Sequence, residues 1–338
     1  MGCFIFSITI ITSLYLISLR PHFQNNGFVR RFFPHPTSDL KQINIGSESF
    51  YISGITQENI FLSNYSTANE LLIVDHNLKT VHRVTLHIPN NVKILQQSAT
   101  VSIDSSIIYI MEGVSPYILH GSSLTFDLNN NSKDTFYFNK GIPISESSYI
   151  LRIFNQKLQS NILVKLNSKI SSLNSFQYKL NKQVDGILCT EGTLQYDRKR
   201  GYIVYVYNFQ NSFVCLDTNL SLIYESRTID TNTIAKIKIA NLSPKVQTFA
   251  APPLYVNKQS CIYNDNLFVY SGIRANNEDI TWFDKGSTID VYSLKKRRYL
   301  YSFYIADFER KKISCFNISA NRLFILQGSH LSSFQISF

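Results

Sequence analysis

The sequence lacks the local motifs that mark the commonest catalytic and nucleotide-binding sites. It contains no GxSxG, no HExxH, no GxGxxG and no phosphate-binding loop of the GxxxxGK type. These absences exclude the nucleophile elbow, the zinc-protease helix, the dinucleotide-binding turn and the nucleoside-triphosphate loop as locally encoded sites. Any catalytic site would have to be assembled from residues far apart in the chain.

Closely spaced cysteines are also missing. The chain has five cysteines, and none forms a CxxC pair, which excludes zinc-ribbon and thioredoxin-type motifs. An odd number at wide spacing argues against a disulfide framework. The four later cysteines fall in apolar segments that we interpret as strands, where cysteine usually behaves as a small buried hydrophobe. They are Cys189, Cys215, Cys261 and Cys315.

Runs that favour helices, rich in Ala, Glu and Leu, are nearly absent. Apolar residues instead make up 44% of the chain, with 20 Tyr and 24 Phe, a composition that favours strands and an all-β fold. The formal charge is +10, but the basic residues are scattered apart from short clusters at 198–200, 295–298 and 310–312. We place these clusters at turns and strand edges, and predict no specific nucleic-acid binding; weak attraction to an acidic surface is the alternative.

The N-terminus carries a hydrophobic segment. Residues 1–19 have no charged side chain, and Phe4 to Leu19 is nearly all apolar. We interpret 1–19 as a signal or membrane-anchor segment and 20–38 as a linker. Arg20, Arg30 and Arg31 follow, which by the positive-inside rule would keep the rest of the chain inside. The apolar run nevertheless favours export, with the remaining chain on the periplasmic side of the cell envelope.

Internal repeats predict the fold. Asp75 to Leu78 and Asp217 to Leu220 share the form apolar strand, Asp-x-Asn-Leu, strand, and each is read as a hairpin; Ile289 to Leu294 is a weaker third copy. A strand, a polar turn and a strongly apolar strand recur six times. The turns are at 57–59, 104–106, 145–147, 197–201, 264–266 and 319–322. Six four-stranded antiparallel units predict a six-bladed β-propeller over residues 39–338.

The predicted ring is closed by a strand from the other end of the chain. After RLFILQG only HLSSFQISF remains, so the last blade lacks its outer strand, which Leu40 to Ile45 can supply. The predicted blades are 48–90, 97–140, 142–182, 190–230, 258–308, and 312–338 completed by 39–46, with an insertion at 231–257. Deleting 39–46 should therefore destabilise the domain, whereas deleting 1–36 should not.

Several segments carry a family resemblance: ITQENIFLSNYSTANELLIVDHNLK, AAPPLYVNKQSC, STIDVYSLKKRRYLYSFYIAD and NRLFILQGSHLSSFQISF. They resemble a family of uncharacterised bacterial six-bladed propeller proteins, over nearly all of residues 40–338. The resemblance implies the fold and an envelope setting. Its motifs are structural, and it implies no catalytic residues.

Candidate site residues are few. His76, His82 and His87 lie close in sequence but fall in a turn, a strand and a strand end, which argues against a shared metal site. Propeller enzymes place acids and amides around a central channel, and the candidates here are Glu58, Asp104, Glu146, Asp197 and Asn257. We predict no metal or other cofactor; the alternative is calcium held by Glu146 and Asp197.

Arg152 and Asn257 are the candidate ligand-binding residues. Arg152 shares a strand face with Ile150 and Phe154, so its charge must be paired or reach water, and a structural role is the alternative. Asn257 follows a proline-containing extended segment at the entry to a blade. We expect a non-enzymatic binding or scaffold propeller for a protein or small-molecule ligand, in contact with the membrane through residues 1–19 if these are retained. The alternative is a hydrolase or oxidoreductase of the lactonase or sugar-dehydrogenase type with a site in the central channel.

Overall fold

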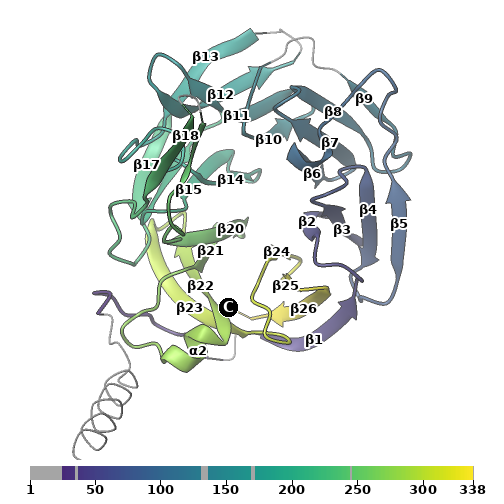
Figure 1. Ribbon diagram of the computed structural model, residues 1–338. Coiled ribbons are helices and arrows are strands. Elements are labelled where there is room, and N and C mark those ends of the chain that lie inside the picture. The colour runs from purple at the N-terminus through teal and green to yellow at the C-terminus, as the bar shows by residue number, and fades with distance from the viewer. Residues whose placement is uncertain (1–24, 35–36, 131–135, 169–171, 244–245, 338) are drawn as a thin grey trace, which may run out of the picture.

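The predicted β-propeller is present. The computed structural model describes residues 25–34, 37–130, 136–168, 172–243 and 246–337. These residues form six four-stranded antiparallel sheets, the blades, arranged in a ring (Figure 1). The first strand of each blade lies nearest the ring centre, and the last lies at the rim. Helix is limited to the short elements η1 (Gln96–Ser98) and α2 (Ile280–Asp284) in the described part of the chain.

The strands follow one another outward in each blade. Blade 1 is β2 (Phe50–Ile55), β3 (Asn59–Asn64), β4 (Glu70–Asp75) and β5 (Val81–Thr85); blade 2 is β6 (Ala99–Asp104), β7 (Ile107–Glu112), β8 (Tyr117–Ser122) and β9 (Leu128–Asn130); blade 3 is β10 (Lys140–Ser145), β11 (Ser148–Asn155), β12 (Ser160–Asn167) and β13 (Ser172–Lys179). Blade 4 is β14 (Gly192–Asp197), β15 (Tyr202–Tyr207), β16 (Ser212–Leu216) and β17 (Leu222–Arg227); blade 5 is β20 (Asn257–Tyr263), β21 (Asn266–Ser271), β22 (Gly286–Ser293) and β23 (Arg298–Ala306); blade 6 is β24 (Cys315–Ser319), β25 (Arg322–Gln327), β26 (His330–Ile336) and β1 (Thr37–Asn44).

The ring closes as the sequence predicted. Strand β1 pairs antiparallel with β26, with Ile43 opposite Leu331. Arg322 of β25 reinforces the closure, because its Nη1 lies 2.9 Å from Oδ2 of Asp39 and its Nη2 donates to the Asp39 carbonyl. The outer strand of the last blade therefore comes from the start of the domain, and no edge of blade 6 is left next to β26.

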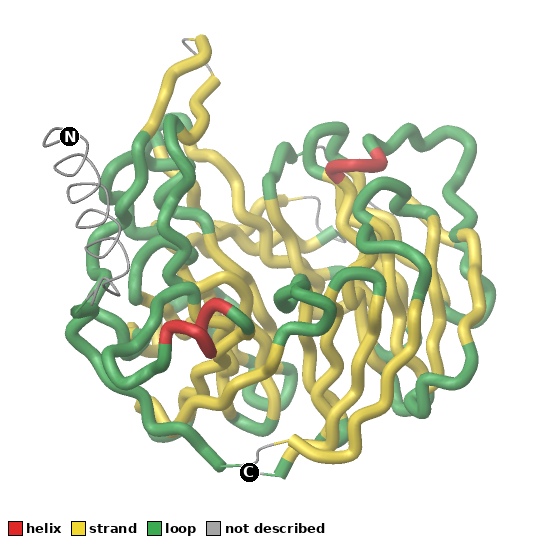
Figure 2. Tube along the Cα trace, turned by 60° about the horizontal axis from the view of Figure 1, so that its bottom comes forward, coloured by secondary structure: helices red, strands yellow, loops and turns green. Residues whose placement is uncertain are grey.

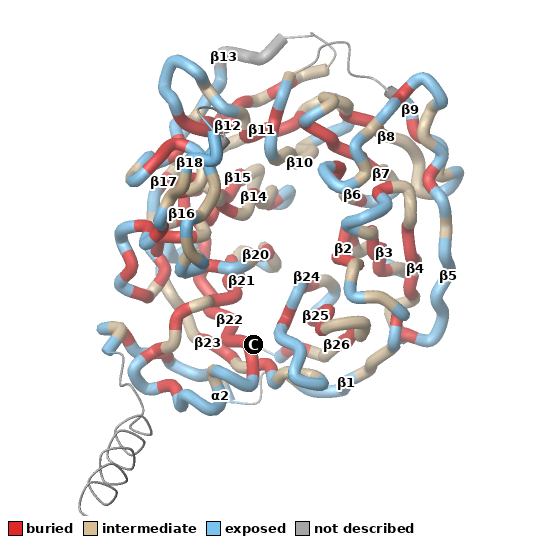
Figure 3. The backbone as a smooth tube through the Cα atoms, in the orientation of Figure 1, coloured by how far each residue is buried: buried red, intermediate tan, exposed pale blue. Residues whose placement is uncertain are grey.

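Apolar clusters join each blade to its neighbours around the ring. One cluster contains Leu62 of blade 1 and Phe324 of blade 6, and another contains Tyr205 of blade 4 and Ile150 of blade 3. The middle strands read as nearly continuous apolar runs because both faces of a blade are covered, and Figure 3 shows them buried while the outermost strands are exposed.

The three predicted hairpins are present, and two of them have the aspartate at the turn. Asp75 lies at the turn between β4 and β5, and Asp217 at the turn between β16 and β17, and their carboxylates accept backbone N–H groups. The residues with left-handed backbone are the leucines, Leu78 (φ 56°) and Leu220 (φ 61°). The third copy is also a hairpin, formed by β22 and β23, but its aspartate does not lie at the turn. Asp290 is a buried residue inside β22, and the turn follows that strand instead.

The two ends of the ring differ in the length of their loops. The turns between first and second strands are short and lie on one face, here called the turn face. The connections from one blade to the next lie on the opposite face, here called the connection face, because antiparallel strands alternate in direction. This face carries the long insertion between β17 and β20, whose hairpin of β18 (Ile239–Ser243) and β19 (Val246–Phe249) projects from the ring at the upper left of Figure 2. The segment 272–285 with α2 joins β21 to β22.

The hydrophobic segment 1–19 lies outside the described residues. In the described part of the chain, no helix has the length and apolarity needed to cross a lipid bilayer.

Candidate functional site

A segment from the predicted linker docks on blade 5. Residues 25–34, here called the N-terminal strap, run along the outer strand β23. Phe32 forms a parallel bridge with Ser302, and the Ser302 N–H donates to the Arg31 carbonyl at 2.9 Å. Phe28 is buried in a small apolar cluster with Val256. The sequence analysis treated 20–38 as connecting chain, because ten residues of mixed composition show no strand or helix periodicity.

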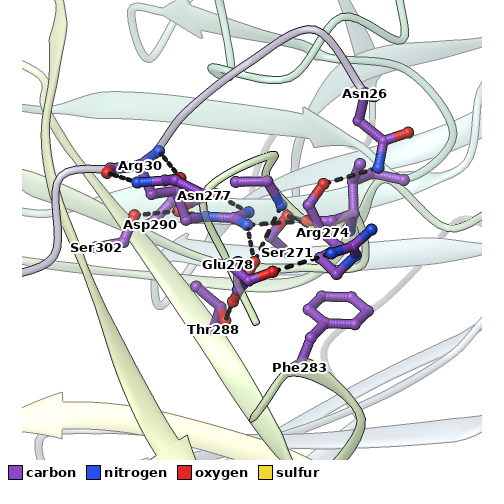
Figure 4. Close-up of polar contacts among 12 residues, drawn as sticks. Asn26, Arg30, Ser271, Arg274, Asn277, Glu278, Phe283, Thr288, Asp290 and Ser302 are labelled. Carbon is purple, nitrogen blue, oxygen red and sulfur yellow. Dashed lines mark hydrogen bonds and ion pairs between the residues drawn. The ribbon is translucent and has the colours of Figure 1, made fainter. Parts of the chain in front are cut away.

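Arg30 fixes the strap through a buried ionic cluster (Figure 4). Its Nε lies 2.7 Å from Oδ1 of Asp290, and its Nη2 lies 3.0 Å from Oδ2 of the same carboxylate. Its Nη1 lies 2.6 Å from Oε2 of Glu278 and donates to the Ile273 carbonyl at 3.0 Å. The three side chains of the ionic cluster are almost entirely removed from solvent.

The charges of this ionic cluster are compensated by groups of the chain itself. Burial by itself would lower the pKa of Arg30, but the charges and hydrogen bonds of Asp290 and Glu278 outweigh burial and raise it. Thr288 donates to Glu278, and Ser302 donates to Asp290. Each of the three guanidinium nitrogens therefore meets an acceptor, as a buried charge requires. A buried aspartate within the apolar strand STIDVYS was the sequence signal for such a partner.

The strap also organises the segment between β21 and β22. The side chain of Asn277 brackets Arg30, accepting from its N–H at 2.9 Å and donating to its carbonyl at 2.8 Å. Asn26 donates to the Arg274 carbonyl at 2.8 Å and to the side chain of Asn276 through its own N–H at 2.8 Å. Two segments about 250 positions apart in sequence are thus joined by paired amide contacts.

These segments enclose a cleft on the connection face, here called the strap cleft. Its volume is about 750 Å³, within the range of small-ligand and peptide sites. The strap, the insertion after β17, and the segment with α2 each contribute to it. The lining residues are Asn25, Asn26, Asn232, Lys236, Leu254, Gly272, Ile273, Arg274, Ile280, Phe283 and Asp284.

Two exposed apolar side chains belong to segments that form the strap cleft, but they are not among its lining residues. Trp282, the only tryptophan of the chain, is 66% exposed on α2, and Ile234 of the insertion is 65% exposed. Asp279 caps the N-terminus of α2, and its side chain accepts the N–H groups of Thr281 and Trp282. This cap holds Trp282 in a defined position on the surface.

Arg152 lies at the junction of blades 3 and 4. It is 6% exposed on β11, its Nε donates to Oδ1 of Asn139 at 2.6 Å, and its Nη1 donates to the Tyr205 hydroxyl at 2.9 Å. Lys140 is its direct partner across the strand pair β10–β11, and the Lys140 Nζ lies 3.3 Å from the Gly192 carbonyl. Neither cation forms an ion pair with a described carboxylate.

Asn257 is the first residue of β20 and is buried. Its Nδ2 donates to the Tyr207 carbonyl at 2.9 Å and to the Gln210 carbonyl at 3.1 Å. These contacts tie the entry of blade 5 to the loop between β15 and β16. The structure does not bring Asn257 together with Arg152, and its ligand-binding role stays a prediction.

The acidic candidates lie on the turn face. Glu146 is exposed, whereas Asp197 is buried, with Oδ1 accepting the N–H groups of Lys199 and Arg200 and Oδ2 unpaired. The described residues contain no group of three or more His, Cys, Asp or Glu side chains arranged to hold a metal ion. Asp197 offers one buried carboxylate oxygen without a partner in the described part of the chain, and the calcium alternative stays a prediction.

Glu58 and Asp104 line a second cleft, of about 760 Å³, on the turn face. Asp104 also pairs with Arg198, which belongs to blade 4, so an ion pair joins turns of two blades that are not neighbours. The structure therefore brings Glu58 and Asp104 together in one cleft, whereas Glu146 and Asp197 are not among the residues that line it.

The cysteine prediction holds for burial. Cys189, Cys215, Cys261 and Cys315 are buried and free. Cys189 lies in a turn before β14, however, and is not a strand residue as predicted. Its backbone N–H donates to Asp185 at 2.7 Å.

Comparisons with known proteins place the chain by its fold. No protein-family model and no curated protein matches it in sequence. Among solved structures, a putative exported protein from Bacteroides fragilis covers 93% of this chain and 98% of its own, with a TM-score of 0.53 and 10% identity. A member of the DUF4221 family from Bacteroides vulgatus covers 89% of this chain and 97% of its own, with a TM-score of 0.52 and 12% identity.

Fold and similarity together define the class: the chain is a six-bladed β-propeller. At 10 and 12% identity the likeness concerns the fold alone. The residues of the strap cleft must therefore carry the functional argument.

Proposed function

We propose that this protein is a non-enzymatic binding propeller of the bacterial cell envelope, and that the strap cleft holds a segment of a protein partner. The observation that carries this proposal is the convergence of three chain segments on one open cleft that combines amide, apolar and basic side chains. Loops placed on a rigid scaffold are where propellers and other folds build their binding sites.

The chemistry of the strap cleft suits a polypeptide. Side-chain amides of Asn25, Asn26 and Asn232 stand beside the apolar groups of Leu254 and Phe283. Amides pair with the N–H and C=O groups of an extended chain, while apolar floors take alternate side chains. Phe283 and Arg274 both line the cleft, and aromatic residues and arginine are enriched among the few positions that dominate binding energy in protein interfaces.

The charge of the strap cleft favours a partner segment with acidic side chains. Lys236 and Arg274 line it against the single acid Asp284, and the chain carries a formal charge of +10. Lys236 is exposed, and Arg274 uses its Nη1 for the Glu278 carbonyl at 3.0 Å, leaving guanidinium donors for a ligand. Electrostatic complementarity of this kind speeds association and selects partners.

The location is inferred from the apolar run Phe4 to Leu19. One of the structural neighbours bears the name of a putative exported protein, which agrees with an envelope setting. Residues 20–24 separate Leu19 from Asn25 in the cleft wall, and five residues reach at most about 18 Å when extended. If the run stays in the membrane, the strap cleft therefore lies close to the membrane surface.

The test uses the full chain in a mild detergent and a displayed peptide library, with Trp282 fluorescence as the readout. We expect selected peptides to combine apolar and acidic residues and to shift the fluorescence on binding. Arg274→Gln should weaken binding about tenfold, the scale of one charge-assisted contact. Leu124→Ala is the matched control, since Leu124 is 83% exposed on the turn face.

Two results would overturn the proposal. One is a peptide selection that is unchanged when Arg274 is substituted. The other is turnover in a screen of lactones, esters and sugar oxidation, which would favour the hydrolase or oxidoreductase alternative.

A further inference from the structure

Two cationic side chains, Lys140 and Arg152, lie next to each other between blades 3 and 4. Lys140 and Arg152 are opposite one another in the antiparallel pair β10–β11, so their side chains leave the sheet on the same side. Both point toward blade 4, because Lys140 reaches the carbonyl of Gly192 on β14 and Arg152 reaches the hydroxyl of Tyr205 on β15. Strands β10 and β14 are neighbours on the inner side of the ring (Figure 1).

This pair lacks the counter-charge that its burial calls for. Arg152 is 6% exposed, and its hydrogen-bond acceptors, Asn139 and Tyr205, are both neutral. Glu191, which precedes β14 of blade 4, raises the pKa of Lys140 by its charge but forms no ion pair with either cation among the described residues. A buried charge is stable only when it is paired or coordinated.

We propose that Lys140 and Arg152 bind a small oxyanion, a carboxylate or phosphate group, at the junction of blades 3 and 4. The site differs from the strap cleft, and the inference does not rest on the function proposed for that cleft. A guanidinium with a lysine ammonium beside it is the usual protein device for such groups, since the fork gives direction and the ammonium adds a point charge.

The arginine is held ready for a ligand. Asn139, which accepts from Arg152, is itself fixed by donating to Oδ1 of Asn161 at 3.1 Å. Asn161 in turn donates to the Thr190 hydroxyl at 3.0 Å. These contacts occupy Nε and Nη1 of the guanidinium on one side and leave Nη2 without a partner among the described residues.

The lowered pKa of Lys140 agrees with an anion-binding site that is empty in the free protein. Burial, followed by the charge of Arg152, lowers the pKa of Lys140 to about 8, and Glu191 opposes this shift. A bound oxyanion would stabilise both cations and raise that pKa. Affinity for the oxyanion should therefore fall as the pH rises past about 8, because the free protein then loses the ammonium charge.

The experiment is calorimetric titration of the full chain in detergent with inorganic phosphate and, separately, with succinate, at constant ionic strength set by sodium chloride. We expect saturable binding of at least one of them, weakened about tenfold by Lys140→Gln. Lys182→Gln is the matched control and should leave binding unchanged, because Lys182 is an exposed lysine in the connection between blades 3 and 4. Arg152→Gln serves as a second variant where it folds.

Each outcome decides the inference. Binding of phosphate alone assigns a phosphate site, binding of succinate alone assigns a carboxylate site, and binding of both assigns a general oxyanion site. No saturable binding of either, or equal loss in the Lys140 and Lys182 variants, overturns the inference.

Discussion

Two buried arginines of this propeller, Arg30 and Arg152, differ in the charge of their partners. Arg30 sits on blade 5 against the two carboxylates Asp290 and Glu278, with contacts of 2.6 to 3.0 Å. Arg152 sits between blades 3 and 4 against neutral acceptors, with the second cation Lys140 opposite it. In the first arrangement carboxylates of the chain itself compensate the arginine charge, whereas in the second no described carboxylate pairs with the two cations.

The difference separates a structural ion cluster from a candidate binding site. A buried ion cluster that satisfies all its members fixes geometry, and removing one member leaves uncompensated charge. Arg30 therefore anchors the strap and, with it, one wall of the strap cleft. Arg152 and Lys140 form no ion pair with a carboxylate in the described residues, so we infer that a ligand supplies the negative charge.

The largest expected effect is at Arg30. Arg30→Met should lower the free energy of unfolding by about 3–5 kcal/mol, because two buried carboxylates lose their partner. Denaturant unfolding measures it, and Arg31→Met is the control, since the exposed Arg31 contacts only the Leu300 carbonyl with its side chain. A loss equal to that of Arg31→Met would show that the cluster does not hold the strap.

The ionic cluster around Arg30 changes what we expect from deleting residues 1–36. The sequence analysis predicted that deleting 1–36 would leave stability unchanged. That deletion removes Arg30 and Phe28 together, so we now expect a clear fall in melting temperature. Deleting 39–46 removes most of β1 and should also destabilise, because β26 would become a free edge.

The next effect concerns Lys140 and pH. Its pKa of about 8 lies below the ordinary lysine value near 10.4, so the unfolded chain binds more protons between these values and stability rises with pH there. The penalty of the buried ammonium is complete below pH 8. Lys140→Met should be more stable than the wild type by about 2 kcal/mol at pH 7 in chloride buffer, after discounting for partial exposure.

That gap should close as the pH rises toward 10, and it should shrink at pH 7 on addition of the oxyanion that binds. Unfolding curves of both proteins across this range measure it. If the difference in free energy of unfolding between the two proteins stays constant with pH, Lys140 has an ordinary pKa. The contrast between Lys140 and the compensated charge of Arg30 would then be weaker.

A smaller effect is expected at Arg152. Arg152→Met loses two hydrogen bonds to neutral groups but also removes a buried charge without a counter-ion. We expect a loss of about 1 kcal/mol in the free energy of unfolding, well below that of Arg30→Met. If the two arginine variants cost the same, Arg152 is a structural residue and the comparison fails.

The smallest effect on stability is expected at Trp282. Its side chain is 66% exposed, so Trp282→Ala should change the free energy of unfolding by less than about 0.5 kcal/mol. The same substitution should weaken peptide binding at the strap cleft. Loss of stability without loss of binding would mean that Trp282 packs α2 against Tyr304, whose ring centroid lies 6.1 Å away, instead of serving a ligand.

The sequence was informative about strands and poor about the site. Apolar segments such as YIVYVY and RLFILQG become β15 and β25, and the closing strand over Leu40 to Ile45 pairs as predicted. Arg152 was correctly identified as a charge on a buried strand. Its partner Lys140 was missed, because a lysine at the start of a strand looks like any solvated lysine until the neighbouring blade is placed against it.

The sequence by itself determined the number of blades, their order and the closure of the ring, because strand patterns and turn residues act locally and repeat. Only the tertiary structure decided which charges meet. Arg30 and Asp290 are 260 positions apart, and Lys140 reaches Gly192 in another blade. A ring brings its first and last segments together, and an ion pair or ligand site depends on distances of a few ångströms that no local pattern encodes.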